Sequence, residues 1–154
     1  MKLFQVFATI VLLVISLTIH ADVLIVANKK SPIQSLNIKD VKKIFLGRLR
    51  MIPNTEIEPN PVDMPQDSMP YQHFYEQVIG LSPPKLKRYR AYYLFSGKGK
   101  IPQEAPSHKV LYEILESDPN AIAYIMDSTP MPDDIRVLLK IGTDSAEQEQ
   151  VVDP

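Results

Sequence analysis

The sequence predicts a small α/β domain with a mixed, mostly parallel sheet flanked by helices. Residues 23–27 form a continuous apolar run, VLIVA, which is typical of a strand covered on both faces. A second buried strand is expected at residues 121–125, and a final strand at residues 135–141. Segments with helical spacing of apolar residues lie between these strands, and this alternation favours an α/β sheet. The 154 residues contain no internal repeat and no long linker, so we expect one folded domain.

The first predicted helix spans residues 38–46. Asn37 can cap this helix, and Gly47 can end it because glycine adopts the left-handed conformation at little cost. Its apolar stripe consists of Ile38, Val41, Ile44 and Phe45. The following segment, residues 53–70, contains five prolines, and we expect only a short extended strand there, at residues 56–62. Because proline lacks a backbone N–H, that strand is predicted at an edge of the sheet.

Two further helices are expected on either side of the chain's most basic segment. One spans residues 68–79, with Asp67 or Ser68 as its cap and Gly80 at its end. Its apolar face consists of Tyr71, Phe74, Tyr75 and Val78. The other begins at Ser107 and turns four apolar residues inward, namely Val110, Leu111, Ile114 and Leu115.

The most basic segment is residues 82–102, SPPKLKRYRAYYLFSGKGKIP. Ser82 and the prolines after it indicate a helix start, and Gly97 and Gly99 indicate its end. The buried face of this helix is expected to consist of Leu86, Tyr89, Tyr93, Leu94 and Phe95. Its basic residues favour a solvated surface; the alternative is that the Gly-Lys loop faces an anion or a partner.

The first 21 residues have the pattern of a secretion signal. Lys2 is followed by an apolar run, and Ala21 offers a small residue for cleavage before Asp22. The competing interpretation is a membrane anchor, but a spanning helix needs about 20 apolar residues and this run is shorter. We therefore expect a signal peptide at residues 1–21, an α/β domain at residues 22–142 and an acidic flexible tail at residues 143–154. The only expected contact with the membrane is through the signal segment, before cleavage.

The composition excludes several classes of function. The formal net charge is −1, so there is no general reason to expect nucleic-acid binding. The sequence has no cysteine, which excludes disulfides, thiolate metal sites and a cysteine nucleophile. His73 and His108 lack a second ligand at metal-binding spacing, and no serine-nucleophile motif or P-loop is present. We expect no enzyme, and therefore no catalytic residue, no metal and no cofactor.

Three segments resemble a known family. Residues 35–48 read SLNIKDVKKIFLGR, residues 95–99 read FSGKG, and residues 118–125 read DPNAIAYI. In order and spacing they resemble segments of the phosphate ABC-transporter substrate-binding proteins, which have the type II periplasmic-binding fold. The resemblance spans most of the chain after the signal segment. It implies a short, single-domain relative that corresponds to one half of that fold and is located in the periplasm.

The resemblance also implies a site, with departures from the family. Family members hold an oxyanion at helix N-termini, helped by hydroxyls and an arginine, because terminal amides lack partners within the helix. Here the segment before the second helix, residues 63–70, reads DMPQDSMP and lacks that arginine. Asp63 and Asp67 add negative charge where a phosphate would lie, and Arg90 stands where short relatives often carry a tryptophan.

Two functions follow from this resemblance. In the first, the protein binds phosphate or another small oxyanion, with Ser68 as hydroxyl donor, Gln66 and Tyr71 as polar neighbours, Ser31 from the loop after the first strand, and Lys98 as attractive charge. In the second, the protein is a ligand-free periplasmic interaction module. Residues 85–100 and 53–70 would then dock a membrane sensor or a transporter subunit.

Overall fold

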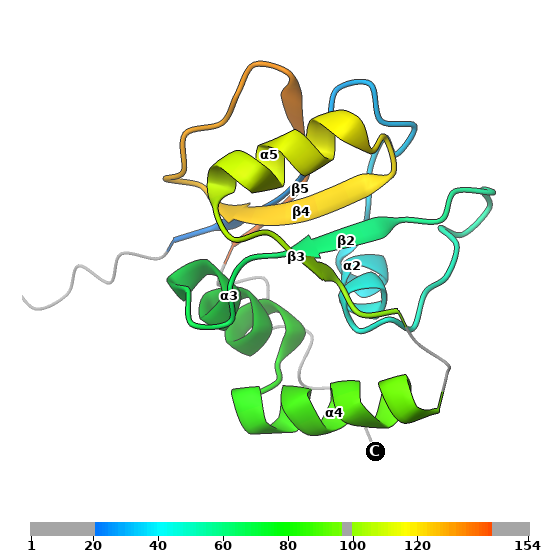
Figure 1. Ribbon diagram of the computed structural model, residues 1–154. Coiled ribbons are helices and arrows are strands. Elements are labelled where there is room, and N and C mark those ends of the chain that lie inside the picture. Colours follow the sequence, from blue (N-terminus) through cyan, green and yellow to red (C-terminus); the bar gives the residue numbers. More distant parts are fainter. Residues whose placement is uncertain (1–20, 97–99, 143–154) are drawn as a thin grey trace, which may run out of the picture.

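The computed structural model describes residues 21–96 and 100–142 (Figure 1). Residues 1–20 of the expected signal peptide, the expected helix end at Gly97 and Gly99, Lys98 and the expected acidic tail therefore lie outside the described residues. The strands are β1 (Val23–Asn28), β2 (Asn60–Asp63), β3 (Gln103–Glu104), β4 (Ala121–Met126) and β5 (Ile135–Ile141). The helices are α2 (Ile38–Phe45), α3 (Met69–His73), the π-helix η1 (Phe74–Ile79), α4 (Pro83–Phe95) and α5 (His108–Ser117).

The strands form one mixed sheet in the order β3-β2-β4-β1-β5. Among the described residues, β2 is parallel to β3 and β4, whereas β1 is antiparallel to β4 and β5. The predicted mixed α/β sheet is confirmed. We expected most strand pairings to be parallel, whereas two of the four pairings among the described residues are parallel. A continuous apolar run indicates that a strand is buried on both faces, but it carries no information on the direction of the neighbouring strands.

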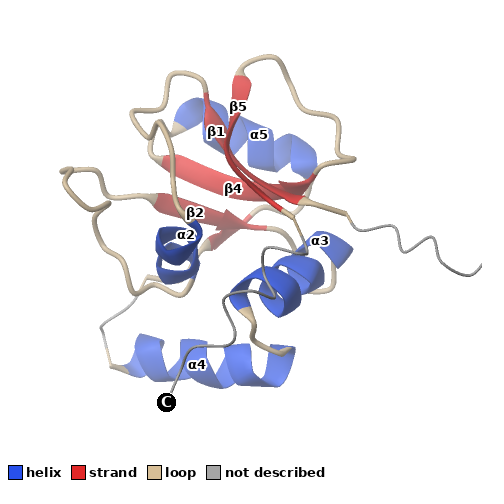
Figure 2. Cartoon of the chain, turned by 180° about the vertical axis from the view of Figure 1, so that it is seen from behind, coloured by secondary structure: helices blue, strands red, loops and turns tan. Residues whose placement is uncertain are grey.

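Helices cover both faces of this sheet. Figures 1 and 2 show α5 on one face, and α2 on the opposite face together with α3 and η1. Helix α4 lies farther out and packs along η1 rather than on the sheet. All six residues of β4 are buried between these layers. The ring of Phe74 stacks on that of Tyr124 from β4 at 4.0 Å and meets Phe45 of α2 edge-on at 4.8 Å.

The local signals at the first helix are confirmed. Asn37 caps α2, because its side chain accepts a hydrogen bond of 2.9 Å from the backbone N–H of Asp40. Gly47 follows the helix with a φ of 71°. The predicted helix at residues 68–79 is also present, but it changes from α to π geometry at Phe74. Such a π segment widens the helix locally and is frequent near functional sites.

Two predictions about the middle of the chain are wrong. Strand β2 is shorter than residues 56–62 and lies inside the sheet, while the two-residue β3 forms the edge. Pro61 is accommodated because β3 pairs only with Val62 and Asp63, beyond the proline. In α4, Leu86 is buried as expected, but Leu94 is 57% and Phe95 93% exposed. The helix contacts the body along η1, so its last turn projects beyond the core.

Candidate functional site

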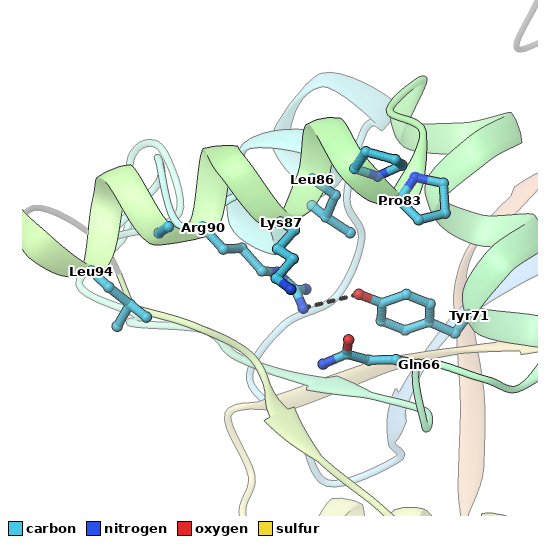
Figure 3. A pocket seen from close by; sticks show the side chains of 9 residues that line it. Gln66, Tyr71, Pro83, Leu86, Lys87, Arg90 and Leu94 are labelled. Atoms are coloured by element: carbon cyan, nitrogen blue, oxygen red, sulfur yellow. Dashed lines mark hydrogen bonds between the residues drawn. The ribbon is translucent and has the colours of Figure 1, made fainter.

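The candidate site is a cavity of about 590 Å³ between α4 and the chain that leads from β2 into α3 (Figure 3). Residues 66–71 supply one wall and α4 supplies the other. The lining residues are Gln66, Tyr71, Pro83, Pro84, Leu86, Lys87, Arg90, Ala91 and Leu94. Those from α4 recur at intervals of three and four, so a single stripe of the helix faces the cavity.

Short-range structure fixes the wall opposite α4. After β2 the chain turns at Pro65, whose carbonyl accepts a 2.9 Å hydrogen bond from the N–H of Ser68. Ser68 then caps α3, since its Oγ accepts a 3.4 Å hydrogen bond from the N–H of Tyr71. The helix therefore begins just before Tyr71. From this position the hydroxyl of Tyr71 reaches across the cavity and accepts a hydrogen bond from Arg90.

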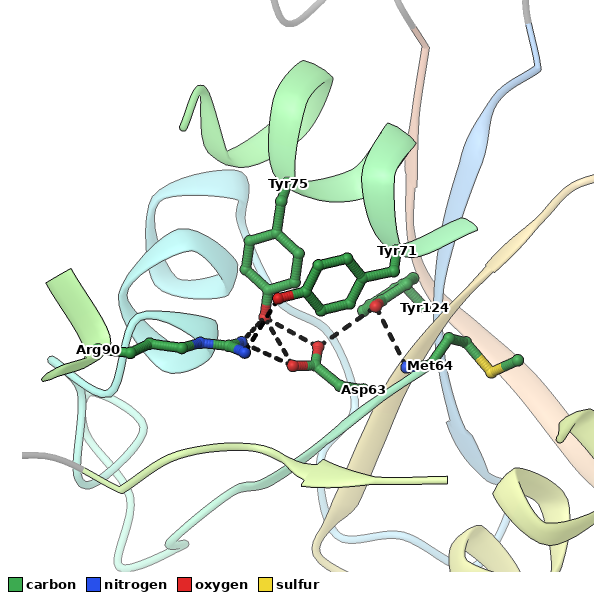
Figure 4. A network of polar contacts seen from close by, with 6 residues as sticks. All are labelled: Asp63, Met64, Tyr71, Tyr75, Arg90 and Tyr124. Carbon is green, nitrogen blue, oxygen red and sulfur yellow. Dashed lines mark hydrogen bonds and ion pairs between the residues drawn. The ribbon is translucent and has the colours of Figure 1, made fainter. Parts of the chain in front are cut away.

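A buried ion pair lies behind the cavity (Figure 4). Arg90 Nη2 donates to Asp63 Oδ2 at 2.6 Å, and the side chains are only 15% and 3% exposed, respectively. Two phenols also donate to Asp63 Oδ1, Tyr75 at 2.8 Å and Tyr124 at 3.3 Å. Arg90 Nη1 donates to Tyr71 Oη at 3.1 Å. Asp63 is therefore surrounded by donors from α4, η1 and β4, and the pair ties the outlying α4 to the sheet.

Burial controls the protonation of this network. Burial raises the pKa of Asp63 above its ordinary value, while the charge and hydrogen bond of Arg90 act in the opposite direction. Burial also raises the pKa of Tyr75 and that of Tyr124, and the carboxylate of Asp63 adds to both shifts. The phenols therefore keep their protons and act as donors to Asp63. Because Asp63 matches the charge of Arg90, the guanidinium brings hydrogen-bond donors to this region but little net charge.

The structure brings some of the expected site residues together and separates others. Gln66 and Tyr71 line the cavity. Ser68 lies between them in sequence, but its hydroxyl is used as the helix cap. Ser31 follows the carboxyl end of β1, which is antiparallel to β4, so it lies at the end of the sheet where β2 and β4 begin. Residues 66–71 follow the opposite end, and Ser31 does not join them.

Sequence reasoning missed the two cations of this cavity. Residues 63–70 contain no arginine, but Arg90 of α4 lines the cavity. Lys87 and Arg90 are three residues apart, with Ala91 and Leu94 on the same stripe, and that spacing was the available signal. The pairing of Arg90 with Asp63 joins residues 27 positions apart, which local patterns do not reveal.

Within residues 21–96 and 100–142, no group of three or more His, Cys, Asp or Glu side chains is arranged to hold a metal ion. In the same part of the chain, no helix combines the length and the apolar character that crossing a membrane requires.

The fold is that of the periplasmic binding proteins, and it covers about half of such a protein. An ABC-type phosphate transport receptor from Vibrio cholerae aligns with a TM-score of 0.57 and 12% identity, over 77% of this chain and 45% of the receptor. A putative phosphate ABC transporter substrate-binding protein with bound phosphate from Clostridium perfringens aligns with a TM-score of 0.59 and 16% identity, over 77% of this chain and 44% of that protein. PstS from Borrelia burgdorferi aligns with a TM-score of 0.52 and 11% identity, over 85% of this chain and 60% of PstS. No family model and no curated protein sequence matches this chain.

The structural similarity to phosphate ABC-transporter substrate-binding proteins confirms the resemblance seen in the sequence, at the level of the fold. The chain spans less than two thirds of the length of each of these proteins.

Proposed function

We propose that this protein is a solute-binding protein of the periplasm that takes phosphate or another small oxyanion, inorganic or organic, in the cavity beside α4. The observation that carries the proposal is the combination of Lys87 and Arg90 with the amide of Gln66 and the hydroxyl of Tyr71 around one cavity. Cations and neutral donors that converge on one cavity favour a negatively charged ligand. The similarity in fold to phosphate receptors supports the same class of solute.

The second candidate is an interaction module that docks a membrane sensor or a transporter subunit. Two observations favour it. Arg90 already forms an ion pair with Asp63, which weakens its attraction for a free anion. The last turn of α4 also exposes Leu94 and Phe95, and exposed apolar side chains next to basic residues suit a protein contact.

A melting-temperature screen separates these two functions. The purified protein is heated with phosphate, sulfate, phosphonates or neutral osmolytes at fixed ionic strength. A ligand at 100 times its dissociation constant adds about 2.7 kcal/mol to the free energy of unfolding, which raises the melting temperature by several degrees. Lys87→Gln is expected to reduce that rise, whereas Lys85→Gln, at an exposed position on the same helix, is not. A flat response to every anion of this panel would refute binding of phosphate, sulfate and phosphonates and would favour the interaction module.

The export proposal has its own test. We propose cleavage after residue 21, with residues 22–142 as the folded domain and residues 143–154 as a tail. Amino-terminal sequencing of the protein recovered from the periplasm is expected to begin at Asp22. Recovery of the intact chain in the membrane fraction would favour an uncleaved anchor instead.

A further inference from the structure

We infer that the cavity beside α4 is built for an organic anion with one negative charge and an apolar body, rather than for an inorganic oxyanion. This inference rests on the proposed function and narrows its ligand class. Three observations carry it: the size of the cavity, the chemistry of its walls and the balance of charge around it.

The cavity is much larger than an inorganic oxyanion requires. Its volume of about 590 Å³ falls within the range of roughly 300–1,000 Å³ that is typical of pockets for organic ligands. Phosphate or sulfate would leave most of this space to water. A ligand with a ring or a short alkyl chain would fill it.

The walls are largely apolar, and most of them come from α4. Five of the nine lining residues are apolar, namely Pro83, Pro84, Leu86, Ala91 and Leu94. Leu94 is 57% exposed, so a ligand placed against it would remove apolar surface from water. Removing such surface is favourable by about 25 cal/mol per Å². Bare phosphate would gain nothing from these walls, whereas a ligand with an apolar body would.

The charge around the cavity suits a single negative charge. The charge of Arg90 is matched by Asp63 at 2.6 Å. Lys87 is the other cation of the lining, and no carboxylate of the described residues forms an ion pair with it. Within the described part of the chain, one cation without an ion pair therefore faces the cavity. A phosphate dianion would bring a second charge close to Asp63, at a Coulomb cost of about 1 kcal/mol per close pair even in water.

Polar groups near Lys87 can orient an acidic head group. Figure 3 shows the ends of Gln66, Tyr71 and Lys87 pointing toward one another. Tyr71 Oη accepts a hydrogen bond from Arg90, so its own O–H proton remains available for a second partner. A carboxylate or sulfonate at this place would bind Lys87 by charge and Gln66 and Tyr71 by hydrogen bonds. Its apolar body would lie along the stripe of α4.

The inference is tested with four probes at fixed ionic strength: phenylacetate, benzenesulfonate, inorganic phosphate and the neutral phenylacetamide. Titration calorimetry and melting temperature give affinity and stabilisation. Phenylacetate or benzenesulfonate is expected to bind at least about tenfold more tightly than phosphate, and phenylacetamide is expected to bind more weakly than phenylacetate. Lys87→Gln is expected to lower the affinity for the organic anions about tenfold or more, with Lys85→Gln as the matched control.

A second variant tests the walls without changing charge. Ala91→Phe fills part of the cavity beside the apolar stripe and is expected to lower the affinity for the organic anions, provided that the variant melts like the parent protein. If Ala91→Phe is unstable, Leu94→Ser tests the same wall, because it removes apolar surface at an exposed position and is also expected to lower the affinity.

Each other outcome overturns a defined part of the account. Phosphate binding as tight as phenylacetate binding overturns the inference but leaves the proposed function standing. Equal binding of phenylacetate and phenylacetamide also overturns it, because the charge then plays no part. Binding of none of the probes, or organic binding that is unaffected in Lys87→Gln, overturns both the inference and the proposed site.

Discussion

The ion pair between Asp63 and Arg90 makes a strong prediction about stability. Arg90→Met keeps the length and apolar stem of the side chain but removes the guanidinium that lies 2.6 Å from Asp63. Removing one partner of a buried pair leaves an uncompensated charge, at a typical cost of about 3–5 kcal/mol. Asp63 is only 3% exposed, but Arg90 is 15% exposed and two phenols continue to donate to the carboxylate. We therefore expect the low end of that range, about 3 kcal/mol, which corresponds to a fall in melting temperature on the order of 10 °C.

The assay is urea and thermal unfolding of the purified protein at neutral pH. Arg88→Met is the matched control, because it removes the same charge from an exposed position of the same helix. In the control we expect a change within about 0.5 kcal/mol. If Arg90→Met were no less stable than Arg88→Met, Arg90 would not anchor α4, and the reasoning would be refuted. Combining Arg90→Met with Asp63→Asn is expected to recover part of the loss, because the unpaired charge is then absent.

The pH dependence of the same variant gives an independent check. Burial already raises the pKa of Asp63 in the folded protein, and loss of Arg90 raises it further. A carboxyl group with a raised folded-state pKa destabilises the protein above that pKa, and the penalty disappears as the pH falls below it toward the unfolded value. The difference in unfolding free energy between Arg90→Met and the parent protein is therefore expected to shrink on acidification. A difference that grows as the pH falls would contradict this assignment.

Three further variants probe the core, the network and the cap. Tyr124→Phe removes a donor to Asp63 and is expected to cost about 1–2 kcal/mol in urea unfolding; no loss would show that the network is satisfied without it. Leu115→Ala, at a fully buried position, is expected to cost about 2–5 kcal/mol, against a small effect for Val137→Ala at a position 41% exposed; equal losses would contradict the position of the core. Ser68→Ala is expected to cost about 1 kcal/mol through loss of the cap and to change anion affinity less than Lys87→Gln; a larger loss of affinity would restore Ser68 as a ligand-binding hydroxyl.

Local signals in the sequence predicted local structure well. Asn37 caps the start of α2 and Gly47 follows its end, as expected. Both signals depend on only a few neighbouring residues, because they act through a side-chain cap and through the left-handed conformation of glycine. The same signals located the helical segment that begins after Ser68. They did not predict its change to π geometry at Phe74, whose ring stacks on Tyr124 of the sheet.

The candidate site depends on relations that local patterns do not contain. Ser31 was placed in the site because it follows a strand, but the antiparallel pairing of β1 with β4 puts it at the other end of the sheet. Arg90 was considered only as a departure from the tryptophan that short relatives often carry at this place. Its role became visible once the structure placed α4 beside η1 and next to Asp63. Gln66 and Tyr71, which were expected as polar neighbours of Ser68, do line the cavity, and their role in binding stays a prediction.

The most direct test of the central claim is an amide NMR titration of the purified protein with phenylacetate. This experiment reports both whether an anion binds and where it binds. The account predicts that the shifts concentrate on α4 around Lys87 and Ala91 and on residues 66–71, including the side-chain amide of Gln66, and that they are reduced in Lys87→Gln. No shifts at saturating concentration, or shifts centred on Ser31 at the opposite end of the sheet, would contradict it.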